Sequence, residues 1–208
     1  MYFFNTNYFG FVKGHDYLTK QDFIKLRSLV GKKNINIINK FENEFANLIG
    51  NGECISYASA RMGFYEIMKA INIGEGDELI LLGFTCSVMA NAIIRRKAIP
   101  IYSDLDKDTF GSSYYEIEKC ISRKTKMIVA QHSFGIPCNV ISIKKIAKLN
   151  KIFLLEDCAL TLGSKISNLD VGNFGDAAIF STDHTKPINT MSGGLVYTQK
   201  EYLIKRLK

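Results

Sequence analysis

The chain has 208 residues, of which 47% are hydrophobic and 23% are charged, and its formal net charge is +7. Such a composition is typical of a globular domain with a sizeable core and excludes a disordered or fibrous protein. The lysines and arginines are scattered without a dense run, which favours a solvated basic surface. Nucleic-acid binding is therefore the least favoured function.

The first residues are aromatic but are interrupted by polar residues and glycine. MYFFNTNYFGFVKG, residues 1–14, has neither a basic start nor a long apolar run, so we expect neither a signal peptide nor a membrane span. The five cysteines form no CxxC pair and there are three histidines in all. We therefore expect no metal site, and free thiols in a reducing cytoplasm.

Two helices are expected before residue 50, at 19–31 and around the apolar stripe of Ile38, Phe41, Phe45 and Leu48. Strands and helices then alternate. The expected strands are 54–58, 78–83, 99–104, 126–131, 152–157, 177–181 and 194–198, and the expected helices are 60–71, 87–96, 113–121 and 141–149. This alternation predicts an α/β domain with a largely parallel sheet flanked by helices.

Ligands of such sheets gather at the carboxyl ends of the strands, where Cys86, His132 and Asp157 occur in this chain. The usual nucleotide motifs are missing: no GxGxxG follows the first strand, and neither GxxxxGK[ST] nor GxSxG occurs. A nucleophilic pair of Cys86 or Cys138 with His132 stays open from the residue types alone.

Four segments, in order and in register, resemble the DegT/DnrJ/StrS family of pyridoxal-phosphate (PLP) sugar aminotransferases. The segments are NIGEGDELILLGFTCSVMANAI, IPIYSDLDKDTF, QHSFGIPCNVISIKKIAKLNKIFLLEDCA and VGNFGDAAIFSTDHTKPINTMSGGLVYT. The resemblance runs from about residue 40 to the C-terminus. It implies the three-layer large domain of the aspartate aminotransferase-type fold, with a mostly parallel sheet between helices.

The resemblance assigns Lys186 the role of the lysine that forms a Schiff base with PLP. A lysine amine reacts only when it is deprotonated, and it can then carry a proton between the substrate carbon and the cofactor. On its spacing alone Lys186 would be a solvated loop lysine. The aligned segment FSTDHTKPINTMSGG, residues 180–194, favours the chemical role.

Other cofactor contacts are implied by the same alignment. Asp157 matches the carboxylate that keeps the pyridine nitrogen protonated, although a turn or helix-capping aspartate is the plainer reading of its position. Ser181 matches a phosphate-contacting serine. Ala60 and Arg61 match a Gly-Thr pair whose amides face the phosphate. Arg61 departs from that pair, yet arginine also pairs with phosphate, and otherwise it is an exposed first-turn charge.

Two more residues depart from the family pattern. Cys86 stands where relatives often place an aromatic residue over the cofactor ring, and a thiol is a smaller and softer cover. Leu160 replaces a glutamine and cannot donate a hydrogen bond to the cofactor's hydroxyl. His132 aligns with a recurrent histidine for which we expect a hydrogen-bonded structural role. The departures indicate a divergent branch or relaxed constraint.

The resemblance also implies the domain organisation and the activity. We expect an N-terminal arm and helices in residues 1–50 and an incomplete cofactor-binding domain in 51–208, with the small C-terminal domain missing. The implied reaction moves an amino group from an amino acid, commonly glutamate, to a nucleotide-linked keto sugar for surface polysaccharide or glycoconjugate synthesis in the cytoplasm. The chain is expected to form a homodimer or to partner a longer relative. The alternative is a non-catalytic relative that keeps the fold without turnover.

Overall fold

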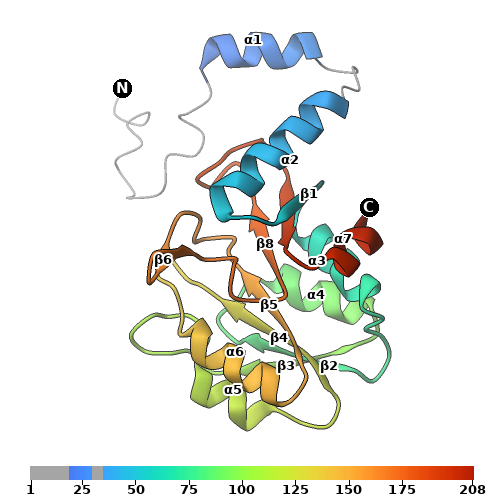
Figure 1. Ribbon diagram of the computed structural model, residues 1–208, viewed down its shortest axis with the longest axis vertical. Helices are drawn as coiled ribbons and strands as arrows, with labels where there is room; N and C mark the ends of the chain where they lie inside the picture. Colours follow the sequence, from blue (N-terminus) through green and yellow to red (C-terminus); the bar gives the residue numbers. More distant parts are fainter. Residues whose placement is uncertain (1–18, 30–34) are drawn as a thin grey trace.

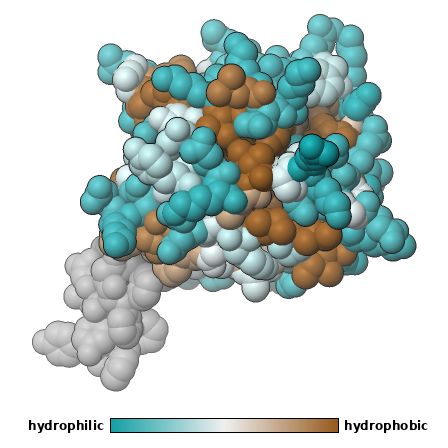
Figure 2. All heavy atoms as spheres, turned by 90° about the horizontal axis from the view of Figure 1, so that it is seen from below, coloured by the Kyte–Doolittle hydropathy of each residue, from teal (hydrophilic) through white to brown (hydrophobic). Residues whose placement is uncertain are grey.

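The computed structural model describes residues 19–29 and 35–208 (Figure 1). Two helices precede the sheet, α1 (Lys20–Leu29) and α2 (Ile35–Ile49). The aromatic segment 1–18 lies outside the described residues, and the division of the chain at residue 50 stays a prediction. On the face that Figure 2 shows, apolar patches interrupt a largely hydrophilic surface. None of the described helices is both long enough and apolar enough to cross a membrane.

Seven strands form one sheet in the order β1-β9-β8-β5-β4-β2-β3. The strands are β1 (Glu53–Tyr57), β2 (Glu78–Leu82), β3 (Ile99–Ser103), β4 (Thr125–Gln131), β5 (Phe153–Asp157), β8 (Ala177–Ser181) and β9 (Gly194–Thr198). The five strands from β8 to β3 are parallel neighbours, whereas β9 runs antiparallel to both β8 and β1. The predicted, largely parallel sheet is confirmed, and each predicted strand agrees to within one residue at either end.

Helices cover both faces of the sheet and complete three layers (Figure 1). They are α3 (Ala60–Ala70), α4 (Ser87–Arg95), α5 (Tyr114–Cys120), α6 (Val140–Leu149) and α7 (Glu201–Leu207). Strand β2 separates two cores because successive side chains point to opposite faces. Leu79 and Leu81 pack with residues of α3, α4 and α7, while Ile80 packs with residues of α5 and α6. The three-layer fold class is thereby confirmed.

Helix α2 covers the β1 end of the sheet on the α5 and α6 side. Its Phe45 and Ile49 pack with Phe180 and other residues of β8 and β9. The predicted stripe is wrong at two positions, because Ile38 and Leu48 are 47% and 59% exposed. The helix meets the sheet only through its C-terminal turns, so the face that is buried there contains Ile49 rather than Leu48.

The sequence did not predict three features. The small hairpin of β6 (Lys165–Ile166) and β7 (Leu169–Asp170) is one, and helix α7 is another. The third is the direction of β9. Strand β9 pairs antiparallel with β8 because the intervening loop, residues 182–193, folds back on itself without the crossover helix that a parallel return requires.

Candidate active site

A pocket of about 260 Å³ opens at the carboxyl ends of β2, β4 and β5. Strand β3 lies on one side of β2 and β4 on the other, so the pocket is at the point where the strand order reverses. Open α/β sheets bind ligands at such points. Three residues predicted for the site, Cys86, Asp157 and Lys186, line this pocket together with Leu160. We call it the Lys186 pocket.

Asp157 is the last residue of β5 and is 6% exposed. Its Oδ1 accepts the backbone N–H of Ala159 at 3.0 Å. Burial raises the pKa of Asp157 above its ordinary value of 3.8, and the Ala159 hydrogen bond and the positive charge of Lys186 act in the opposite direction. A buried carboxylate in this condition is stabilised by any cation that enters the pocket.

Lys186 lies in the loop between β8 and β9, whose two ends are held together. The N–H of Thr182 donates to Gly193 O at 3.0 Å, and the N–H of Thr190 donates to Thr182 O at 2.9 Å. The N–H of Lys186 itself donates to Asp183 O at 2.9 Å, which fixes the backbone beside the pocket. The side chain of Lys186 is half-buried in the pocket rather than fully solvated. A lysine amine next to a buried carboxylate suits a ligand that carries both a carbonyl carbon and a basic nitrogen.

Glu156 precedes Asp157 but lies on the opposite face of β5, as strand geometry predicts. It is fully buried. Its carboxylate accepts backbone N–H groups from Gly172 at 2.8 Å, Phe174 at 2.7 Å and Gly175 at 2.6 Å. These bonds fix the turn before β8 to the end of β5. Glu156 therefore supports the strand end from which Asp157 faces the pocket.

His132 completes the contacts of Glu156 and has the structural role that the sequence predicts. Its Nε2 lies 3.1 Å from Glu156 Oε2, and its Nδ1 accepts the N–H of Cys138 at 3.1 Å. Since Nδ1 is an acceptor, the ring proton is on Nε2 and faces Glu156. Both ring nitrogens are thus engaged, so the geometry does not support His132 as the base of a cysteine nucleophile.

His132, Glu156 and Cys158 also place three possible metal-binding atoms within 4.8 Å of one another. The hydrogen bonds above account for the imidazole and the carboxylate. Burial raises the pKa of the Cys158 thiol to about 12, so the sulfur keeps its proton within this hydrogen-bonded cluster. The cluster is explained as a hydrogen-bonded network behind the pocket.

Two further predicted residues meet at the end of β8. Ser181 is the register partner of Gly194, and a Cβ at Gly194 would lie 2.0 Å from the backbone N of Ala60. Glycine is therefore required where α3 begins against β9. The hydroxyl of Ser59 caps the helix by accepting the N–H of Met62 at 3.3 Å. We call Ser181, Gly194 and Ala60 the α3 corner, and its backbone amides suit an anion.

Arg61 directly follows Ala60 in α3, but it does not line the Lys186 pocket. It is exposed, and it lines a groove between α3 and α4 that also contains Arg95. Of the described residues, those lining the Lys186 pocket do not include Arg61, Ser181 or Ala60. The structure thus brings Cys86, Asp157 and Lys186 into one pocket and places Ser181 with Ala60 in the α3 corner. The cofactor contacts expected of the six residues stay a prediction: Ala60, Arg61, Cys86, Asp157, Ser181 and Lys186.

Sequence reasoning did not single out Gln131 and Phe134, which also line the pocket. Gln131 is the last residue of β4, and its Nε2 donates to the carbonyl of Phe84 and to the hydroxyl of Ser133, both at 3.1 Å. One signal was available, because Gln131 ends a predicted strand and HSFG directly follows it, where ligands of such sheets gather.

Comparison with known proteins agrees with this geometry. Residues 27–208 match the DegT/DnrJ/EryC1/StrS aminotransferase family. The chain belongs to this family. The new family member is 37% identical over 171 residues to the GDP-perosamine synthase of Escherichia coli O157:H7, an alignment that covers 82% of this chain and 47% of that protein. The resemblance found in the sequence motifs is confirmed.

Solved structures show the same fold. An aminotransferase from Psychrobacter cryohalolentis aligns with a TM-score of 0.79 and 29% identity, covering 82% of this chain and 43% of that chain. NtdA from Bacillus subtilis, solved with its cofactor PMP bound, aligns with a TM-score of 0.80 and 24% identity over 92% of this chain and 45% of that one. The family member spans about half the length of the curated relatives it matches.

Proposed function

We propose that this family member binds PLP in the Lys186 pocket and transfers an amino group from an amino acid to a keto sugar carried on a nucleotide. The observation that carries the proposal is the presence of the half-buried Lys186 and the buried Asp157 in one pocket. The similarity to a GDP-perosamine synthase supports a nucleotide sugar as the substrate class.

The residues present fit this cofactor. Burial disfavours the charged form of Asp157 even with the charge of Lys186 in the same pocket, and a protonated pyridine nitrogen would offset that cost. Lys186 supplies the amine for a covalent link. Ser181 and the first amides of α3 supply hydrogen-bond donors for a phosphate. Bound PLP supplies an electron sink for the substrate carbon.

The chain's own residues then have distinct tasks. Lys186 would hold the cofactor covalently, and its free amine could move a proton to or from the substrate carbon. Asp157 would keep the ring nitrogen protonated. Cys86 and Leu160 would contribute apolar surface that excludes water from the pocket, without the stacking and hydrogen bonding that the family pattern would supply there.

Finer expectations belong to the same proposal. Glutamate as the amino donor, a role in surface polysaccharide or glycoconjugate synthesis, a cytoplasmic location, and a homodimer or partner-subunit assembly are all supported by family membership. The departures at Cys86, Leu160 and Arg61 favour one alternative, a relative that keeps the fold and the pocket without turnover.

The half-reaction with the donor tests the proposal. The purified chain is mixed with PLP and glutamate, and 2-oxoglutarate is measured by mass spectrometry, with Lys186→Ala as the control. We expect about one equivalent of 2-oxoglutarate per cofactor-loaded chain from the wild type and none from the variant. A wild-type chain that holds PLP on Lys186 but yields no oxo acid with glutamate or any other amino acid would leave the non-catalytic alternative.

A further inference from the structure

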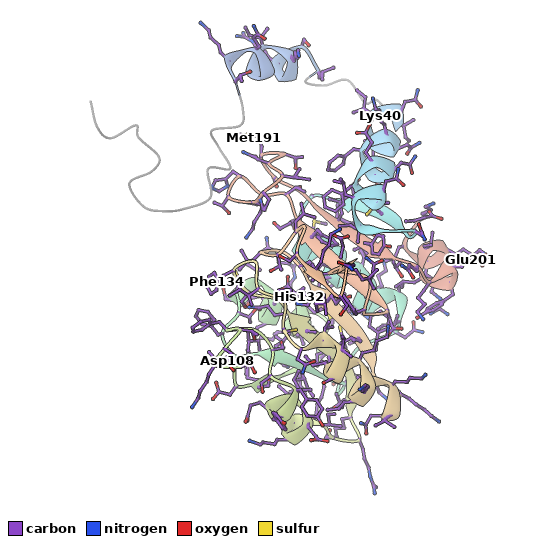
Figure 3. The ribbon with its side chains drawn as sticks, turned by 60° about the vertical axis from the view of Figure 1, so that its left-hand side comes forward. Lys40, Asp108, His132, Phe134, Met191 and Glu201 are labelled. Atoms are coloured by element: carbon purple, nitrogen blue, oxygen red, sulfur yellow. The ribbon has the colours of Figure 1, made fainter. Side chains whose placement is uncertain are left out.

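Two exposed aromatic side chains lie at the mouth of the Lys186 pocket. Phe84 follows β2 and Phe134 follows β4, and they are 54% and 62% exposed. Their ring centroids are 6.1 Å apart, with 48° between the ring planes. Figure 3 shows Phe134 at the outside of the molecule, whereas His132 lies further in. Exposed apolar groups that gather at the edge of a pocket mark a place where a ligand is bound.

The side chain of Gln131 connects the two segments that carry these rings. Buried Gln131 donates one side-chain N–H toward Phe84 O and another toward Ser133 Oγ, which ties the segment after β2 to the segment after β4. Ser133 and Ile136 exchange backbone hydrogen bonds of 3.2 and 2.8 Å in a tight hairpin. The backbone segments that carry the two rings are therefore held together before a ligand arrives, which lowers the entropic cost of binding.

The turn itself does not explain the choice of phenylalanine. Phe134 has φ +55° and Gly135 has φ +84°, values typical of the two-residue hairpin turn that prefers Asn-Gly. A phenylalanine in this left-handed region is strained. Phe110 offers a matched comparison, since it has φ +54°, is 48% exposed, precedes a glycine and does not line the pocket.

The position of the rings limits the part of a substrate that they can contact. If the proposed function holds, the reacting carbon must reach Lys186, so the neighbouring atoms of the sugar ring pass the mouth of the pocket. Among the described lining residues, the fixed charges belong to Asp157 and Lys186, while Phe84, Phe134 and Leu160 make the mouth apolar. Such a mouth suits the C–H face of a pyranose and does not suit a pyrophosphate.

We propose that Phe84 and Phe134 form an aromatic rim that stacks on the apolar face of the substrate's sugar ring and selects nucleotide sugars over bare nucleotides. Both are specificity-determining residues that would touch the substrate directly. This inference rests on the proposed function, because it takes the sugar to be the group next to Lys186.

Calorimetric titration of the PLP-treated chain with two probes, GDP-mannose and GDP, tests the rim. The readout is the ratio of the two affinities. In Phe134→Asn we expect this ratio to fall about three- to tenfold, the range of an aromatic contact. The thermal midpoint should hold or rise, because asparagine suits the left-handed turn. Phe84→Leu should lower the ratio less, and Phe110→Asn should leave it unchanged.

Three results would overturn the rim: a wild-type chain without preference for GDP-mannose, an unchanged ratio in Phe134→Asn, or an equal loss in Phe110→Asn. A change of sedimentation coefficient with an unchanged ratio would assign the rings to a subunit contact and also overturn it. Reductive trapping of PLP on the same samples separates the two proposals. A lower ratio of the two affinities in a variant whose Lys186 is still labelled reports on the aromatic rim alone. Absence of labelling in the wild type contradicts the proposed function.

Discussion

Two neighbouring carboxylates at the end of β5 lie in opposite environments. Glu156 is fully buried, accepts three backbone N–H groups and faces the ring proton of His132. Asp157 faces the Lys186 pocket, where it accepts the N–H of Ala159 and its pKa is raised by burial. A buried carboxylate surrounded by donors maintains the structure, whereas one that faces an open pocket, with its charged form disfavoured by burial, is prepared to bind a cationic group.

The largest effect is expected from Glu156→Ala. The change leaves the N–H groups of Gly172, Phe174 and Gly175 without their acceptor in the core, so the free energy of unfolding should fall by about 3–5 kcal/mol. Urea denaturation followed by circular dichroism measures it. Glu44→Ala, which removes an exposed ion pair with Lys40, is the control and should change stability by less than about 0.5 kcal/mol. A loss below about 1 kcal/mol for Glu156→Ala would remove the distinction between the two carboxylates.

Asp157→Asn should instead weaken cofactor binding without lowering the stability of the fold. The amide can still accept the Ala159 N–H, but it cannot hold a proton on the cofactor's ring nitrogen. PLP affinity should therefore fall about 10- to 100-fold, the strength of a hydrogen bond between charged groups. Equilibrium dialysis against PLP measures this fall. The cofactor-free variant should be at least as stable as the wild type at neutral pH, because no buried charge remains.

The pH dependence of folding stability should also differ between Asp157→Asn and the wild type. The pKa of Asp157 in the folded chain lies above its ordinary value of 3.8, so the folded state binds more protons than the unfolded state between those two values. Wild-type stability therefore falls as the pH rises through this window, and asparagine has no such slope. The thermal midpoint of Asp157→Asn minus that of the wild type should grow from about pH 4 upward and then level off. A difference that shrinks with rising pH would show that burial does not raise this pKa.

A smaller effect tests whether the α3 corner works with the pocket. In Gly194→Ala the new methyl group meets the backbone of Ala60, so stability should fall by about 1–3 kcal/mol and PLP affinity should fall with it. Gly74→Ala is the matched control, because a Cβ there has no atom within 4 Å, and both quantities should stay unchanged. A Gly194→Ala chain that keeps full stability and PLP affinity would separate the α3 corner from cofactor binding.

Much of the fold could be predicted because hydrophobic periodicity is a local signal. The strands from Glu53 to Thr198 were found to within one residue, and so was the start of α3 at Ala60. The exposure of Ile38 and Leu48 could not be predicted, since periodicity finds an apolar face but not the length of helix that meets the sheet. The direction of β9 depends on how a helix-free loop folds back, and this requires long-range contacts.

The site divides in the same way. Asp157 ends β5 and Lys186 follows β8, and both line one pocket at the carboxyl ends of the strands. The separation of Arg61 from the Lys186 pocket could not be predicted, because spacing along the chain does not show that Arg61 lines the groove between α3 and α4 instead. Gln131 was missed because its importance lies in its side-chain hydrogen bonds, above all the one to Phe84, which is 47 residues away in the sequence.

The most direct test of the central claim is reductive trapping of the cofactor. The wild-type chain is incubated with PLP and reduced with borohydride, and the labelled peptide is identified by mass spectrometry, with Lys186→Ala treated in parallel. We predict one label on Lys186 and loss of that label in the variant, because the half-buried amine lies beside the carboxylate of Asp157. Labelling spread over exposed lysines such as Lys40 and Lys205, or a folded wild-type chain without any label, would contradict the assignment of this pocket.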